Sequence, residues 1–190
     1  IILTEDKPSW HRLVETVDGQ LEYRMGAGKR SKATPRTYRT LVRSIVQAAK
    51  AHQLEHIAIH LGPMGCPQLE EKGSEWYFRT LAENLELAQY EFTKYKTKKK
   101  DVKELQEILV CGIGAAEKRS FSAGQTIGQA ANFARDIANT TGEHMTPSKL
   151  AAAAKDAVKG TKATVKILNF TAIKKEKMGL LEAVGKGAAD

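Results

Sequence analysis

The chain has 190 residues, a formal net charge of +8 and 42% hydrophobic residues. This length allows one domain with a packed core, or one domain and part of a second, and this composition excludes global disorder. No apolar run approaches the roughly 18 residues that cross a bilayer, and two cysteines are too few for a disulfide framework, which favours the cytoplasm.

The chain begins IILTEDKPSW, without Met, a basic segment or a small-residue cleavage site, and it ends in AVGKGAAD after a glycine-rich turn. We therefore expect no signal peptide, and we expect both ends to lie inside a longer protein. The first 33 residues carry little pattern. IILTEDK is consistent with the end of a strand, and LVETVDGQL with a short helix or strand that ends at Asp18-Gly19.

Thr34-Pro35 predicts the start of a helix that runs to about His52, because a capping hydroxyl precedes a proline at the first helical position. Residues 54–62 predict a buried strand with His56 and His60 on one face and Ile57, Ile59 and Leu61 on the other. A second helix is predicted over 74–91 and a second strand over 105–113. The first helix has one apolar stripe, formed by Tyr38, Leu41, Val42, Ile45, Val46 and Ala49.

A long helix is predicted over 120–139, where Gly124 and Gly128 permit a close approach to a neighbouring backbone. Another helix follows from Thr146-Pro147 to about Gly160, then a strand over 163–169 and a short helix over 171–178. This alternation indicates an α/β protein with a mixed or parallel sheet. The expected apolar stripe of the long helix consists of Ile127, Ala130, Ala131, Ala134, Ile137 and Ala138.

The residues themselves indicate no active site. GAGKRS at 26–31 lacks the first glycine of a phosphate-binding loop, since that position is Tyr23. His56, His60 and Cys66 fall short of the four ligands of a structural zinc site. Glu143 and His144 are adjacent in a loop without a nucleophile, so we expect no catalytic residue and no metal ligand in this chain.

Two basic segments leave an alternative open. Residues 29–43 contain six Lys or Arg and no acid, and residues 94–103 contain six Lys and one Asp. One interpretation is a solvated helix face and loop. The other is a nucleic-acid-binding module, for which the candidate residues are Arg36, Arg39, Arg43, Lys98, Lys99 and Lys100.

Three segments, in order, resemble the leucyl aminopeptidases of the M17 family. ANFARDIANTTGEHMTPSKLA resembles the segment that joins the two domains of that family, through Ala134 to Thr140 and Met145-Thr146-Pro147, with Thr141 in place of the usual Pro. His144 stands where Asn or Asp is common. Tyr90, Phe92 and Lys94 to Lys96 resemble the family's helix end, and MGLLEAVGKGAAD resembles its M-G-x-x-x-x-V-x-x-G-S segment, with Ala188 in place of Ser.

The resemblance implies a macro-like N-terminal α/β domain with a mixed sheet flanked by helices over 1–119. A connecting helix over 120–140 and the truncated start of a second α/β domain, the aminopeptidase domain, over 141–190 would follow. The implied whole protein is a cytoplasmic hexamer that binds two divalent ions, zinc or manganese, and removes N-terminal residues from peptides. The family's metal ligands and catalytic Arg lie beyond the V-x-x-G-S segment, so none maps onto this chain, and we expect the chain alone to be inactive scaffold. A macro-like fold also raises the possibility of an ADP-ribose pocket at the loop GPMGCP.

Overall fold

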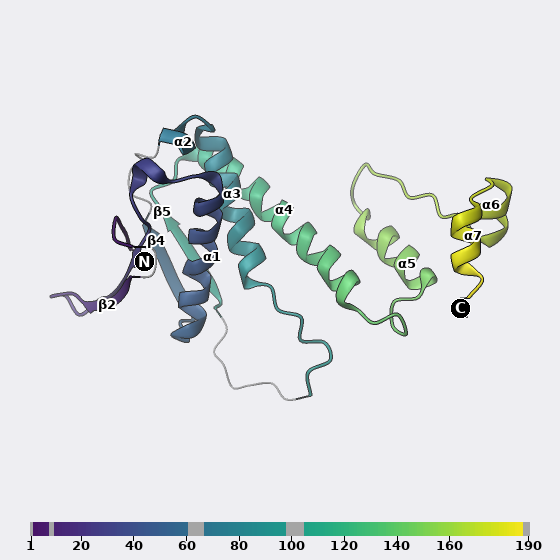
Figure 1. Ribbon diagram of the computed structural model, residues 1–190, viewed down its shortest axis with the longest axis horizontal. Helices are drawn as coiled ribbons and strands as arrows, with labels where there is room; N and C mark the ends of the chain where they lie inside the picture. The colour runs from purple at the N-terminus through teal and green to yellow at the C-terminus, as the bar shows by residue number, and fades with distance from the viewer. Residues whose placement is uncertain (1, 8–9, 61–66, 98–104, 188–190) are drawn as a thin grey trace. The chain divides into compact units, whose positions relative to one another are not determined.

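The computed structural model describes residues 2–7, 10–60, 67–97 and 105–187 (Figure 1). The chain divides into two compact units, Ile1–Ala134 and Arg135–Asp190. None of the described helices combines the length and the apolar character of a membrane-spanning segment.

The first unit opens with a three-stranded sheet. It lies within the first 33 residues, for which the sequence pattern gave no clear secondary structure. The strands are β1 (Ile2–Thr4), β2 (His11–Glu15) and β3 (Leu21–Gly26), in the order β1-β3-β2. β1 is parallel to β3, and β2 is antiparallel to β3, so the sheet is mixed, as predicted. β2 ends at Glu15, and the end predicted at Asp18-Gly19 falls in the turn between β2 and β3, where Gly19 has a φ of +74°.

A second sheet holds two parallel strands, β4 (His56–His60) and β5 (Glu107–Cys111). Their connection contains two helices, α2 (Pro67–Glu70) and α3 (Gly73–Gln89). The alternation predicted for β4 is confirmed, because Ile57 and Ile59 are buried while His56, Ala58 and His60 are exposed. Leu61 lies outside the described residues.

The predicted first helix is α1 (Pro35–Ala51), which follows a short 3-10 turn, η1 (Arg30–Lys32). The backbone N–H of Thr37 donates to the Thr34 hydroxyl, and the Thr37 hydroxyl accepts from the backbone N–H of Thr34. This reciprocal cap confirms the helix start that the sequence predicted. The predicted stripe is also confirmed, since α1 buries Tyr38, Val42, Ile45, Val46 and Ala49.

The hydrophobic core lies between α1, α3 and the strands of the first unit. Tyr38 of α1 and Tyr77 of α3 stack with ring centroids 4.5 Å apart, and the Tyr38 hydroxyl donates to the backbone oxygen of Tyr77 at 3.2 Å. The remaining buried members of this core are Tyr23, Met25, Val42, Ile45, Val46, Ala49, Ile57, Ile59, Leu69, Leu81 and Leu85. The helix predicted over 74–91 is confirmed as α3.

The long helix α4 (Ala115–Asn139) begins five residues before its predicted start at 120. Its predicted apolar stripe is wrong in the first unit, since Ile127 is 45% exposed and Ala130 and Ala134 are exposed. The buried residues of α4 are Gly124 and Gly128. The helix therefore packs through its smallest residues, because they allow the closest approach of two backbones.

The second unit contains α5 (Pro147–Ala157), α6 (Phe170–Lys175) and α7 (Gly179–Gly185). Residues 163–169, predicted as a strand, form no regular structure. A strand needs a neighbour to pair its backbone groups, and the described part of this unit contains no other strand. None of these three helices buries a described residue, and the most exposed large apolar side chains are Leu180, Leu181 and Val184.

Candidate functional site

The segment that leads from α4 into α5 is held by local hydrogen bonds. Thr140 directly follows the last residue of α4, and its hydroxyl donates to the backbone oxygen of Asp136 at 2.7 Å. The backbone N–H groups of His144 and Met145 both donate to the backbone oxygen of Thr141 at 2.9 Å. The Thr141 hydroxyl and Nδ1 of His144 lie 3.1 Å apart. These contacts form a tight turn in which each threonine has a definite structural role.

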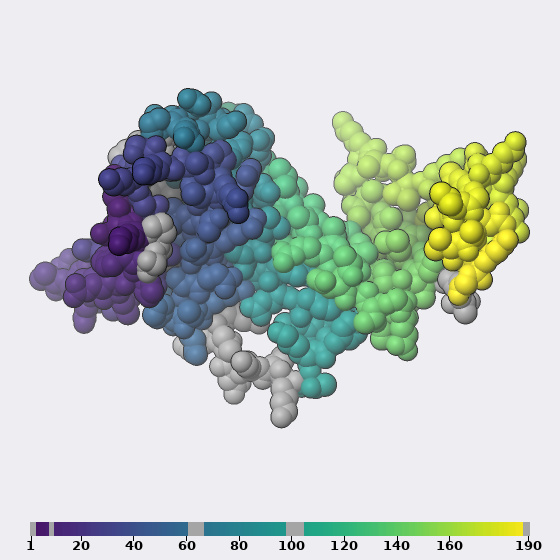
Figure 2. Space-filling view, viewed as in Figure 1, coloured from purple at the N-terminus to yellow at the C-terminus, as the bar shows by residue number. Residues whose placement is uncertain are grey.

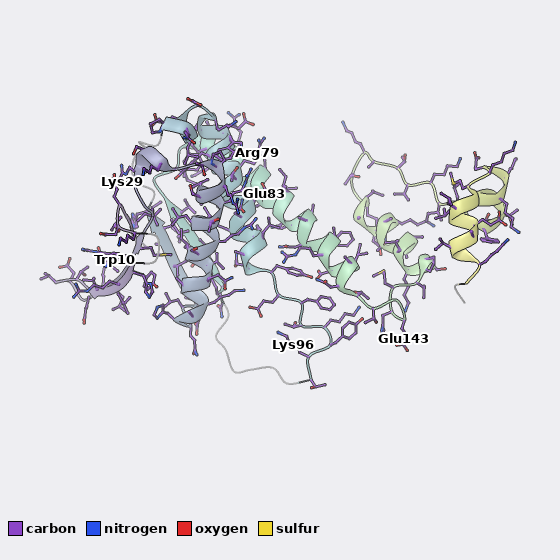
Figure 3. All side chains as sticks on the ribbon, viewed as in Figure 1. Trp10, Lys29, Arg79, Glu83, Lys96 and Glu143 are labelled. Atoms are coloured by element: carbon purple, nitrogen blue, oxygen red, sulfur yellow. The ribbon has the colours of Figure 1, made fainter. Side chains whose placement is uncertain are left out.

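Thr146 and Pro147 begin α5 as the sequence predicted. The Thr146 hydroxyl accepts from the backbone N–H of Lys149 at 3.4 Å, and Pro147 occupies the first helical turn. Glu143, labelled in Figure 3, lies in the exposed turn before this cap. Acid–base catalysis usually depends on a site that excludes water. The solvent exposure of Glu143 and His144 therefore favours a structural role for this pair.

A close contact between α3 and α4 lies within the first unit. A Cβ atom added at Gly124 would overlap the backbone oxygen of Arg79, and one added at Gly128 would lie 2.5 Å from Cβ of Glu86. Nδ2 of Asn132 donates to the backbone oxygen of Glu86 at 3.0 Å. Figure 3 labels Arg79 on α3, the helix that α4 contacts here. The close approach predicted from Gly124 and Gly128 is present.

Two of the three arginines proposed for nucleic acid contact α3. Nε of Arg43 donates to Oδ1 of Asn84 at 2.9 Å, and the guanidinium carbon of Arg39 lies 5.7 Å from the ring centroid of Trp76. Arg36 is exposed near the start of α1. Lys98, Lys99 and Lys100 lie outside the described residues. Arg39 and Arg43 therefore make contacts within the fold of this chain. The nucleic-acid interpretation stays a prediction.

Asn84 is a buried polar residue whose structural role the sequence analysis missed. Its side chain has no solvent exposure, and its Nδ2 donates to the backbone oxygen of Thr80 at 2.9 Å while its Oδ1 accepts from Arg43. The signal was available, because Asn84 is a polar residue beside the apolar stripe of α3. Buried amides almost always need hydrogen-bond partners, and the helix that packs on α3 supplies one here.

The two histidines of β4 lie on its exposed face. Nδ1 of His56 lies 3.3 Å from Oε2 of Glu107 across the β4–β5 pair, and Cys66 lies outside the described residues. Both histidines are exposed, and they share one face of the strand as the sequence predicted. Among the residues that the structure describes, no three His, Cys, Asp or Glu side chains gather closely enough to hold a metal ion.

A cavity of about 1000 Å³ lies in the first unit and is lined by residues of the three-stranded sheet, β4 and α1. Its lining is largely apolar, and its charged pair is Arg30 and Glu5, whose Nε and Oε1 atoms lie 3.2 Å apart. A diphosphate would require positive charge in the cavity, and Glu5 neutralises the positive charge of Arg30. Most of the loop GPMGCP lies outside the described residues, so the ADP-ribose interpretation stays a prediction.

Known proteins match this chain both in sequence and in fold. A probable cytosol aminopeptidase of Bdellovibrio bacteriovorus is 31% identical over 167 residues, which are 86% of this chain and 33% of that relative. A tomato leucine aminopeptidase mutant matches with a TM-score of 0.73 at 22% identity, over 90% of this chain and 34% of that one. The bottromycin maturation enzyme BotP, solved in complex with Mn, matches with a TM-score of 0.62 at 21% identity, over 80% and 30%.

The chain thus spans about a third of the length of the relatives that it matches. Two profiles of one family match it in chain order. The profile described as "Cytosol aminopeptidase family, N-terminal domain" matches residues 23–99, which contain β3, α1, β4 and α3. The profile described as "Cytosol aminopeptidase family, catalytic domain" matches residues 132–190, which contain the turn and the Thr146 cap. The resemblance predicted from sequence is confirmed, and this chain belongs to the cytosol aminopeptidase family.

Proposed function

We propose that this chain is part of the N-terminal region of a leucyl aminopeptidase, a metalloenzyme that hydrolyses the first peptide bond of its substrates. Residues 1–119 would form the macro-like domain, 120–140 the connecting helix and 141–190 the start of the catalytic domain. The observation that carries this proposal is the segment from Thr140 to Pro147. Its turn and helix cap give a structural reason for the family's motif at the point where the catalytic-domain profile begins.

The second unit supports the idea that its fold is completed elsewhere. Leu180 is 88% exposed, Val184 is 79% exposed and Leu181 is 55% exposed, on a helix that buries no described residue. Side chains of this size usually contribute to a core or an interface. Further residues of a catalytic domain would cover them.

The family's activity would require two divalent metal ions, zinc or manganese, and BotP is a structural neighbour that was solved with Mn. The described residues of this chain do not fit such a pair of ions, since no group of three potential ligands is present among them. The resemblance to the family assigns the metal-binding and catalytic residues to a part of the protein beyond this chain. The role of this chain would be to support assembly, as part of a cytoplasmic homo-hexamer, and to position the catalytic domain.

Two experiments test the proposal. The purified chain, supplied with manganese or zinc, is expected to release no leucine from leucyl p-nitroanilide above a blank. A longer chain that continues past Asp190 is expected to cleave the same substrate, because it would supply the family's metal ligands and catalytic Arg. A longer reading frame without such ligands would contradict the proposal.

A further inference from the structure

The outer strand of the three-stranded sheet has a free edge. β2 pairs with β3 on one side, and no described strand pairs with it on the other. Four of its five residues are exposed and Val14 is half-buried. Figures 1 and 2 show this hairpin at the margin of its unit. An uncovered edge presents unpaired backbone groups to which another strand can bond.

The hydrogen bonds at the two ends of β2 show which groups face that edge. The backbone oxygen of Trp10 accepts from the N–H of Gly26, and the N–H of Thr16 donates to the oxygen of Gln20, both at 2.8 Å. Residues that bond to a neighbouring antiparallel strand alternate with residues that point away from it. His11, Leu13 and Glu15 therefore present their N–H and C=O groups outward.

The side chains at this edge include several apolar groups in solvent. Leu13 is 46% exposed, Leu21 is 66% exposed, and Val17 in the turn is fully exposed. β2 contains no proline or lysine and keeps an unbroken register with β3. Proline, lysine and breaks in register are common means by which exposed edges avoid pairing. β2 has none of these, so its edge is open to association.

We propose that β2 pairs with β2 of a second copy of this chain, in antiparallel orientation about a two-fold axis at Leu13. Each Leu13 then lies opposite its counterpart, and His11 lies opposite Glu15 at both ends. All three pairs involve residues whose backbone groups point outward, so each pair exchanges both backbone hydrogen bonds. The two sheets become one continuous sheet, and the pairing is isologous.

The side-chain pattern of β2 favours this register and a second copy as the partner. A register centred on Arg12 places Arg12 directly opposite Arg12, and one centred on Val14 places Leu13 opposite Glu15. Like charges directly opposite are destabilising, whereas apolar and opposite-charge pairs stabilise. In the register centred on Leu13, the strand is complementary to itself in apolar contact and in backbone hydrogen bonding, and the His11 ring lies where it can donate a hydrogen bond to Glu15.

Disulfide trapping tests this pairing directly. Leu13→Cys, in a chain with Cys66 and Cys111 changed to serine, would place two cysteines opposite each other with Cα atoms about 5.5 Å apart, within the range of a disulfide. We expect a covalent dimer under mild oxidation. Val17→Cys is the matched control, because that residue is more exposed but does not lie opposite itself, and it is expected to cross-link at least about tenfold more slowly.

Sedimentation of the unmodified chain and two charge variants tests the register. His11→Glu places Glu opposite Glu15 twice and is expected to weaken dimerisation about tenfold. His11→Glu combined with Glu15→Lys restores opposite charges and is expected to recover most of the affinity. Both variants lose the His11–Tyr23 stack, so a difference between them reports the charge pairs and not the fold.

Three results would each overturn the proposal. They are a chain that remains monomeric throughout the micromolar range, equal cross-linking of the two cysteine variants, and a double variant no tighter than His11→Glu. These measurements read the oligomeric state alone, so their outcome is independent of whether the longer protein is a peptidase.

Discussion

At the scale of single residues, the buried amide of Asn84 connects α3 to the arginine face of α1. Arg43 donates to this amide, so Arg43→Met would leave Oδ1 of Asn84 buried without that donor. An unsatisfied buried acceptor costs about 1–3 kcal/mol, and we expect the free energy of unfolding to fall by that amount. Urea denaturation measures it.

The control is Arg36→Met, which makes the same change at an exposed position of the same helix. It is expected to alter the free energy of unfolding by less than about 0.5 kcal/mol. Equal effects of the two substitutions would show that Arg43 contributes only its general helix propensity. The hydrogen bond from Arg43 to the buried Asn84 was not predictable from sequence, because a helical arginine opposite an apolar stripe is usually solvated.

The phenol of Tyr38 makes the stability of the first unit sensitive to high pH. Burial raises the pKa of Tyr38 far above its ordinary value, and the neighbouring Tyr77 adds to the shift. The folded state therefore keeps the phenol neutral, whereas the unfolded chain ionises it near pH 10. The stability that this difference provides is fully present below about pH 10 and is lost as the pH rises further, by up to about 1.4 kcal/mol per pH unit.

Tyr38→Phe separates this effect from that of the other tyrosines. At pH 8 the variant is expected to be about 1 kcal/mol less stable, because it lacks the hydrogen bond to the backbone oxygen of Tyr77. That difference should shrink toward zero near pH 11, since only the parent chain loses stability through Tyr38. Urea denaturation at both pH values gives the comparison, and a constant difference would exclude Tyr38 as the source.

At the scale of elements, the contact between α3 and α4 depends on two glycines. Gly124→Ala would force Cβ against the backbone oxygen of Arg79, and we expect it to destabilise the chain by about 1–3 kcal/mol, despite the better helix propensity of Ala. Thermal unfolding measures the effect. Ser122→Ala, exposed on the same helix, should be neutral or slightly stabilising. A stable Gly124→Ala variant would mean that the two helices do not approach this closely.

The elements show where local pattern is sufficient for prediction. The helix starts at Thr34-Pro35 and Thr146-Pro147 depend on neighbouring residues alone, and both predictions are confirmed. The alternation of β4 was equally clear. The β2–β3 hairpin was ambiguous, because β2 is largely exposed and carries Arg12 on one face and Glu15 on the other.

Two elements of the second half differ from the prediction because their contacts are not local. Residues 163–169 alternate as a strand does but have no described strand to pair with. Residues 179–185 form α7, a helix for which the sequence analysis made no prediction. The packed face of α4 was also misassigned, since apolar periodicity favoured Ile127 over the small residues that contact α3.

At the scale of the whole molecule, the two units differ in how much core they contain. The buried hydrophobic residues all lie in the first unit, among the residues that the structure describes. The family was predictable from sequence because its motif at 134–147 has a strict local geometry of turn and cap. The catalytic ligands were not predictable here, because the resemblance assigns them to residues beyond this chain.

The peptidase assay of the 190-residue chain tests the central claim most directly. The purified chain is incubated with manganese or zinc and leucyl p-nitroanilide, and a longer chain that continues past Asp190 is assayed beside it. We predict hydrolysis by the longer chain and none above the blank by the shorter one. Metal-dependent cleavage by the 190 residues alone would contradict the claim that the reactive groups lie elsewhere.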